Sequence, residues 1–208
     1  MDDVEAKRQL VEAAVCAYCK GENIQVLSPY NKCTELSVDK LNAVIREHVN
    51  PTAPDKLELS TRDITFRDGD RVIITKNNYE LNCSNGDVGV LRITDIEDPD
   101  CPVFHVELSD GRRPKWTSNY GLAHLRHAYA LTVHKAQGSE YDQILFPVSR
   151  NAMNMMYRNL LYTAISRGKH QVILYGDSDA LSVALQKGAD ARKSMLVNKT
   201  RSKQMKCA

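Results

Sequence analysis

The sequence predicts an α/β protein with a small all-β domain inserted into its parallel sheet. Strand-like apolar runs alternate with helical patterns up to about residue 64 and again after about residue 123, and closely spaced turn signals fill the segment between them. Strands that alternate with helices are typical of a mostly parallel sheet. Short strands joined by tight turns are typical of antiparallel hairpins.

The first segment is expected to hold one buried strand between two helices. Apolar residues at helical spacing predict a helix over about 4–20, and Gly21 is suited to end it. The apolar run 24–27 predicts a buried strand, and a second amphipathic helix is expected over about 37–49. Asn50-Pro51 is a typical helix end.

The middle segment predicts hairpins that form a small barrel. Its turn dipeptides are Asp68-Gly69, Asn85-Gly86 and Asp110-Gly111, and the latter two have strand-like runs on both sides. After it, the pattern predicts strands over 128–133, 144–148 and 172–175, and a helix over 155–167 that is apolar on most sides. The predicted division is 1–64 and 123–190 for the α/β domain, 65–122 for the insertion and 191–208 for a basic tail.

Composition is that of an ordinary globular protein, with 42% hydrophobic and 26% charged residues and a net charge of +2. No apolar run approaches the ~20 residues that span a bilayer, and the N-terminus is polar, so we expect no membrane association and a cytoplasmic location. The basic tail is suited to phosphate contacts, although a solvated terminus is the favoured interpretation. Cys16 and Cys19 have no second ligand pair nearby in sequence, so we expect free thiols and no metal.

Two polar segments follow buried runs and carry the chemistry. The first, residues 130–142, is a buried strand followed by a loop with a cation, an amide and two hydroxyls: Lys135, Gln137, Thr132 and Ser139. Such groups suit phosphate oxygens, and Glu140 is suited to a ribose hydroxyl. An ordinary strand–helix loop is the alternative.

The second segment, residues 160–167, places Arg167 at the end of a predicted buried helix. A rigidly held arginine at a sheet edge is suited to reach a transferring phosphoryl group. The alternative is an arginine that only complements the negative end of the helix dipole.

These two segments resemble motifs V and VI of the RecD-like (RecD- and TraI-type) superfamily-1 DNA helicases, whose patterns are T-x-H-K-[SA]-Q-G-S-E and Y-T-A-[IL]-[ST]-R. Residues 69–89 resemble motif IVa of that family, which leads into an inserted barrel, and residues 26–29 and 41–51 resemble the motif IV region. The ordered matches cover about residues 24–177.

The resemblance implies a RecA-like, P-loop-NTPase-type parallel sheet with an inserted small β-barrel, in an enzyme of the exodeoxyribonuclease V α-subunit type. It implies ATP-driven translocation along single-stranded DNA, usually 5′ to 3′, with Arg167 as the catalytic arginine finger. The residues that it assigns to the nucleotide are Gln137, Gly138, Glu140 and Arg167. The residues that it assigns to the nucleic acid are Thr132, His134, Lys135, Ser139, Asn78 and Asn85.

The phosphate-binding loop of such enzymes, G-x-x-x-x-G-K-[ST], is missing. Gly168-Lys169 comes nearest, but His170 follows it and Thr163 stands at the first glycine. We therefore expect ATP and Mg²⁺ to bind in a longer parent enzyme and not stably to this chain alone. The expected partners are single-stranded DNA and an N-terminal RecA-like domain of the same polypeptide. The alternatives are a stand-alone, non-enzymatic nucleic-acid-binding module and a subunit that supplies Arg167 in trans.

Overall fold

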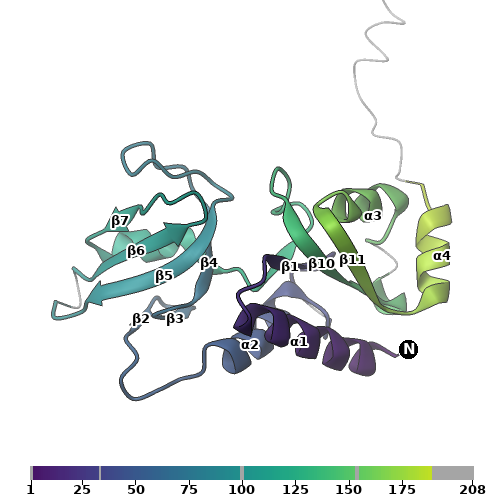
Figure 1. The fold of residues 1–208 in the computed structure, drawn as a ribbon, viewed down its shortest axis with the longest axis horizontal. Helices are drawn as coiled ribbons and strands as arrows, with labels where there is room; N and C mark the ends of the chain where they lie inside the picture. Colours follow the sequence, from purple (N-terminus) through teal and green to yellow (C-terminus); the bar gives the residue numbers. More distant parts are fainter. Residues whose placement is uncertain (1, 33, 99–100, 153–154, 189–208) are drawn as a thin grey trace, which may run out of the picture.

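The computed structural model describes residues 2–32, 34–98, 101–152 and 155–188. It consists of two parts that lie side by side: an α/β part built from both ends of the described chain, and a β part built from its middle (Figure 1). The predicted basic tail, 191–208, lies outside the described residues.

The α/β part is built on a four-stranded parallel sheet of order β11-β10-β1-β9. β1 is central, and its Val26 lies opposite Leu145 of β10 and Ala130 of β9. The parallel sheet that the sequence predicts is therefore confirmed. Its strands are β1 (Ile24–Ser28), β9 (Ala130–Thr132), β10 (Tyr141–Val148) and β11 (Gly168–Gly176).

Helices cover both faces of this sheet (Figure 1). Because successive side chains of a strand point to opposite faces, Val26 packs with one pair of helices and its neighbour Leu27 with the other. The first pair is α1 (Asp3–Cys19) and α2 (Val38–Val49), and the second is α3 (Arg158–Ile165) and α4 (Ser178–Gln186). A short 3-10 helix, η2 (Arg150–Ala152), follows β10.

The β part has an antiparallel five-stranded sheet of order β7-β6-β5-β4-β8 and a core of its own, which includes Phe66, Leu91 and Phe104. None of its strands joins the parallel sheet, so the predicted small all-β domain is confirmed. The strands are β4 (Arg71–Ile74), β5 (Val88–Asp95), β6 (Val103–Leu108), β7 (Lys115–Trp116) and β8 (Leu125–His127). A hairpin of β2 (Glu58–Ser60) and β3 (Thr65–Arg67) precedes them, and η1 (Asn119–His124) leads into β8.

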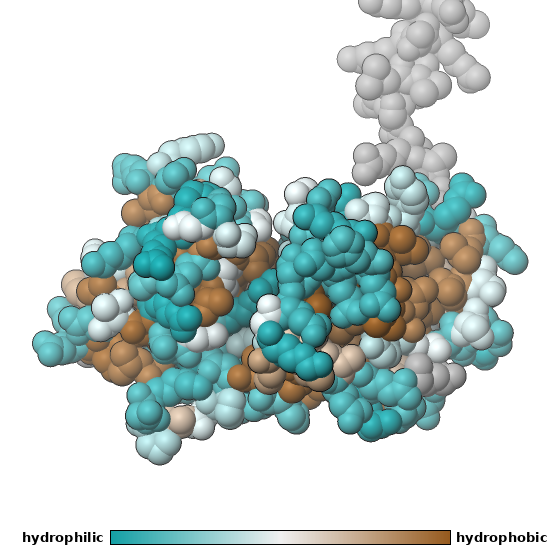
Figure 2. Space-filling model, in the orientation of Figure 1, coloured by the Kyte–Doolittle hydropathy of each residue, from teal (hydrophilic) through white to brown (hydrophobic). Residues whose placement is uncertain are grey.

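The helix α3 differs from its prediction. It begins only at Arg158, and the face that packs on the sheet is narrow, with Leu160, Leu161 and Ala164 buried. Tyr162 is 74% exposed and Ile165 is 43% exposed. The helix is therefore buried along one face only and is not enclosed on most sides. Figure 2 shows hydrophobic surface over this side of the α/β part, near β11 and α4.

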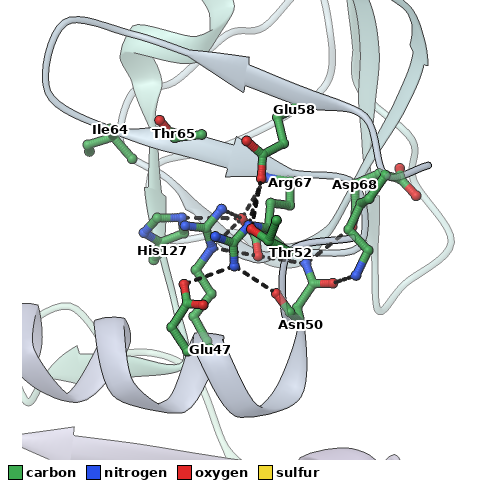
Figure 3. A network of polar contacts seen from close by, with 12 residues as sticks. Glu47, Asn50, Thr52, Glu58, Ile64, Thr65, Arg67, Asp68 and His127 are labelled. Atoms are coloured by element: carbon green, nitrogen blue, oxygen red, sulfur yellow. Dashed lines mark hydrogen bonds and ion pairs between the residues drawn. The ribbon is translucent and has the colours of Figure 1, made fainter. Parts of the chain in front are cut away.

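The two parts are joined around one buried carboxylate, Asp70, in the turn before β4. Arg46 of α2 donates from Nε to both carboxylate oxygens, at 3.0 and 2.9 Å. Asn50 Nδ2 and Tyr129 Oη donate to Oδ1 at 2.8 and 3.1 Å, and His127 Nε2 lies 3.3 Å from Oδ2. The chain passes into the β part at Asn50 and returns from it at Tyr129, so Asp70 is bonded to both crossings between the two parts. Figure 3 shows the network of polar contacts around them.

These contacts outweigh the cost of burying the charge. Burial alone would raise the pKa of Asp70, but contacts from His127 and Arg46, the backbone N–H of Arg67 and the Asn50 amide hold it well below its usual value. Asp70 is therefore ionised in the folded protein at neutral pH. A further bond closes the junction, in which the N–H of Ala128 donates to the carbonyl of Arg71 at 2.9 Å.

We expect Asp70→Ala to destabilise the protein by about 3–5 kcal/mol, because it leaves Arg46 as a buried charge without its partner. Denaturant unfolding followed by circular dichroism measures this. Asp55→Ala is the matched control, since Asp55 is exposed and its loss should change stability by less than about 0.5 kcal/mol. Equal stabilities for the two variants would contradict the role given to Asp70.

Candidate nucleic-acid interface

A groove of about 970 Å³ runs between α2 and the opposite wall formed by β8, the end of β9 and the tip of the β2–β3 hairpin. It therefore lies where the α/β part and the β part meet. Its polar and charged lining residues are Asn31, Lys32, Asp39, Asn42, Arg46, Glu47, Asp63, Thr65, Arg126, His127 and Lys135.

Two cations reach this groove because two parallel strands end beside each other. Ser28 at the end of β1 lies opposite Thr132 at the end of β9, so the residues after each strand meet at the carboxyl edge of the sheet. Lys32 follows β1 and Lys135 follows β9. Thr132 is buried, and its hydroxyl accepts a bond from the N–H of Lys135 at 3.3 Å, so Thr132 shapes the turn that presents Lys135.

The cations of the groove are available to an anionic ligand. Lys32, Arg126 and Lys135 are exposed, and among the residues that the structure describes none of the three has a carboxylate within ion-pair distance. Arg46, by contrast, is already neutralised by Asp70. Unpaired cations beside a groove are the usual footprint of a phosphate-backbone contact.

Residues 133–140 cross from the carboxyl edge of the sheet to its amino edge. β9 ends at Thr132, and β10, which runs in the same direction, begins at Tyr141, so the segment between them must return across the sheet. Buried Val133 and Ala136 pack against the core on the way, and Gly138, with φ of 90°, turns the chain into β10. The sequence predicted one polar loop at the carboxyl edge; the structure shows that only its first half lies there.

Arg167 lies at the amino edge, beside the second half of this segment. Its backbone carbonyl accepts a bond from the N–H of Tyr141 at 2.9 Å, and its Nη1 donates to the carbonyl of Ser139 at 3.3 Å. Nη2 donates to Ser166 Oγ at 3.2 Å, whereas Nε is buried without a partner among the described residues. The guanidinium is thus positioned by weak bonds and keeps donor capacity for a ligand.

A second hollow, of about 540 Å³, opens at the same edge between the sheet and the β part. Ser139 and Glu140 line it together with Arg71, Arg112 and Lys169. Glu140 Oε2 lies 3.6 Å from Lys169 Nζ, and both side chains are largely exposed.

The structure therefore separates the residues singled out from the sequence into two places. Lys135 lines the groove, whereas Ser139, Glu140 and Arg167 gather at the amino edge. His134, Gln137 and Gly138 are exposed between them.

Asn78 and Asn85 lie elsewhere, on the loop between β4 and β5, and line neither hollow. Asn78 pairs through its backbone with Cys83, and its side-chain oxygen accepts a bond from the N–H of Leu81 at 3.1 Å. The N–H of Asn85 donates to Asn77 Oδ1 at 2.7 Å. In this structure these bonds shape the loop.

Several groove residues escaped sequence reasoning. Lys32 had a usable signal, since it follows a buried strand in the same way as Lys135 does. Arg126 and His127 had none, because a three-residue strand shows no periodicity.

No group of three or more metal-ligating side chains comes together in the described part of the chain. Cys16 and Cys19 are exposed free thiols there. None of the described helices is long and apolar enough to cross a membrane.

Two protein-family models match the chain. The UvrD-like helicase C-terminal domain matches residues 127–175, which include the crossing segment and Arg167. The SH3 domain of ATP-dependent RecD-like DNA helicases matches residues 41–107, which include most of the β part.

Curated relatives match over much of the chain but are far longer. The ATP-dependent RecD2 DNA helicase of Deinococcus radiodurans is 31% identical over 185 residues, which is 86% of this chain and 24% of that protein. The RecBCD enzyme subunit RecD of Mycobacterium tuberculosis is 28% identical over 121 residues, 58% of this chain and 20% of that protein. The chain thus spans about a quarter or less of these relatives.

Solved structures share the fold. The Pif1 helicase from Bacteroides in complex with ADP-AlF3 and ssDNA has a TM-score of 0.54 at 18% identity, over 88% of this chain and 45% of that one. A Bacteroides Pif1 bound to ssDNA has a TM-score of 0.53 at 16% identity, over 89% of this chain and 46% of that one. At these identities the likeness shows a common fold, a RecA-like sheet with a small β domain.

Proposed function

Because the chain carries the C-terminal region of a RecD-like superfamily-1 helicase, we propose that it supplies a single-stranded-DNA groove and an arginine finger to an ATP-driven DNA motor. One observation carries the proposal: residues 133–140 connect Lys135 in the groove with the edge where Arg167 lies. The motor itself is a longer parent enzyme, whose N-terminal RecA-like domain is the partner of this region.

The groove is the DNA site of the proposal. Lys32, Arg126 and Lys135 would contact phosphates, and such contacts are independent of base sequence. His134 and Ser139 lie on the same crossing segment, and their contacts with the DNA would change as the DNA strand advances. Asn78 and Asn85 would add contacts from the β4–β5 loop when the strand lies across the β part.

The amino edge is the nucleotide site of the proposal. ATP, with Mg²⁺ held by the N-terminal domain, would supply the transferable phosphoryl group. Arg167 would exchange its 3.3 Å bond to the Ser139 carbonyl for the phosphoryl oxygens, where negative charge spreads in the transition state. Gln137, Gly138 and Glu140 would contact the rest of the nucleotide.

The exposed apolar side chains near Arg167 support a docked domain at this edge. Ile165 is 43% exposed only two residues before Arg167, and Tyr162, one turn earlier, is 74% exposed. Apolar groups that gather beside a polar site are typical of surfaces that another domain covers.

The second candidate is a nucleic-acid-binding module without ATP chemistry. It is favoured by one feature: the 208 residues contain no G-x-x-x-x-G-K-[ST] loop to cradle a triphosphate. The groove would then be the whole active surface, and Arg167 would serve only to fix the Ser139 loop.

We expect the chain to bind single-stranded DNA with little sequence preference and with a steep dependence on salt. Lys135→Ala should weaken binding and reduce the slope of log K against log salt by about 0.7, the value for one phosphate contact on a single strand. Fluorescence anisotropy with oligo-dT measures both. Lys20→Ala is the matched control, since this exposed lysine at the end of α1 lies outside the groove. Identical slopes for the two variants would place the DNA on another surface.

In the longer parent, Arg167→Ala should lower ATP turnover by roughly 10³- to 10⁵-fold, as for other arginine fingers. Arg167→Lys should not restore it, because a lysine cannot copy the planar fork of donors. Affinity for DNA should stay within about two-fold, since the groove lies at the opposite edge of the sheet. Arg158→Ala at the other end of α3 is the control. Turnover within a few-fold of wild type would make Arg167 a structural residue.

The 208-residue chain alone should hydrolyse no ATP, because its sequence has no G-x-x-x-x-G-K-[ST] loop to hold the triphosphate. A phosphate-release assay with and without oligo-dT measures this, and DNA binding in the same preparation shows that the protein is folded. Steady, DNA-stimulated release of phosphate would refute the division of labour proposed here.

A further inference from the structure

Tyr120 projects from the β part and is surrounded by cationic and aromatic side chains. Its side chain is 67% exposed. Lys76 Nζ lies 5.7 Å from the centroid of the Tyr120 ring and 3.3 Å from its hydroxyl oxygen. The His124 ring meets the same ring edge-on, with centroids 4.8 Å apart and an interplanar angle of 85°. We refer to Lys76, Tyr120 and His124 as the Tyr120 platform.

The backbone under the Tyr120 platform is held in place. Gly121, the next residue of η1, packs so closely on Trp116 that an added Cβ would come within 2.4 Å of the indole ring. Trp116 in turn stacks on Phe104 of β6 at 5.5 Å. The N–H and the hydroxyl of Thr75 both donate to the His124 carbonyl, at 2.8 and 2.9 Å. The exposed ring is therefore presented by rigid structure, which lowers the entropy cost of binding to it.

Cations connect the Tyr120 platform with the groove. Arg126 follows His124 by two residues on β8 and lines the groove. Within the described residues, neither Lys76 nor Arg126 has a carboxylate within ion-pair distance. Burial lowers the pKa of His124, and the nearby charges of Lys76 and Arg126 lower it further. Lys76 lies on the loop after β4 and Arg126 lies on β8, the edge strand of the sheet, so both cations are close to the His124 ring.

We propose that the Tyr120 platform stacks an unpaired base of single-stranded DNA where the strand leaves the groove along β8. The inference rests on the proposed DNA groove and extends it onto the β part. A tyrosine ring stacks on any base, so the contact is tolerant of sequence, and Lys76 is placed to contact the adjoining phosphate. Arg126 would hold the phosphate between the two sites.

The first test compares three variants of the full chain by fluorescence anisotropy with oligo-dT of graded length. Tyr120→Ala should weaken binding of long oligonucleotides by about 5-fold or more, the lower end of the effect of one base–aromatic stack. Tyr120→Phe should bind as wild type does, because it keeps the ring. Tyr79→Ala is the control, since Tyr79 is 87% exposed on the same β part but has no ring partner among the described residues.

Length separates the Tyr120 platform from the groove. Because the Tyr120 platform lies beyond Arg126, oligonucleotides that only fill the groove should bind wild type and Tyr120→Ala equally. Lys135→Ala should weaken binding at every length. Thermal unfolding of each variant shows whether the β part is intact. Tyr120→Ala should leave the unfolding temperature unchanged, because the Tyr120 side chain is exposed.

Bases and phosphates are separated by a second ligand, an oligo-dT of the same length whose outer half carries abasic sites. Wild type should lose affinity for it, and Tyr120→Ala should show no further loss. Equal binding of both ligands by wild type, or an equal effect of Tyr79→Ala and Tyr120→Ala, overturns the stacking role. If Lys135→Ala still weakens binding in that case, the groove stands and only the Tyr120 platform fails. If wild type binds no oligo-dT at low salt, both proposals fail.

Discussion

A single ionised carboxylate, Asp70, joins segments that are distant in sequence. Its oxygens accept bonds from α2 through Arg46, from the end of that helix through Asn50, and from the returning chain through Tyr129. Arg46 and Asn50 belong to the outgoing crossing between the α/β part and the β part, and Tyr129 belongs to the returning one, so this one acceptor holds the two crossings together. The groove lies directly over these contacts, with Arg46 and His127 in its lining, and its shape depends on them too.

The crossing segment 133–140 connects the groove with the amino edge of the parallel sheet. A connection between parallel strands must return from one edge of the sheet to the other, and here the return path starts at a groove cation and ends beside Arg167. Val133 and Ala136 are buried along it, so a displacement at Lys135 meets packed core and is transmitted along the segment. The proposed DNA groove and the proposed nucleotide site at the amino edge therefore share the residues of this one segment.

The sequence predicts the parallel sheet well because its strands are apolar runs and its helices have clear periodicity, as in 24–27 and 37–49. It predicts Lys135 and Arg167 as functional because their motifs are specific, and it expects Lys135 in a loop at the carboxyl edge, but it does not say at which edge Arg167 lies. The structure holds the two residues at opposite edges of the sheet. The groove could not be predicted, because its far wall is built from β2, β3 and β8. Each of these strands has only three residues, which is too short to show a periodic pattern. Asp70 carries no local sign of its burial, because its partners are contributed by residues 24 positions earlier and 59 later.

Asn50, where the chain enters the β part, and Tyr129, where it leaves, both donate to Asp70 Oδ1, so the chain leaves the β part next to the place where it entered. An insertion whose ends already touch is a closed loop on the surface of its host, and its length is nearly free of thermodynamic consequence: doubling it adds only about 0.6 kcal/mol of closure entropy. The host sheet can therefore keep its register while the inserted domain lengthens, shortens or exchanges its surface loops over evolutionary time. Selection can act on the reach of the inserted domain without disturbing the edge that holds Arg167.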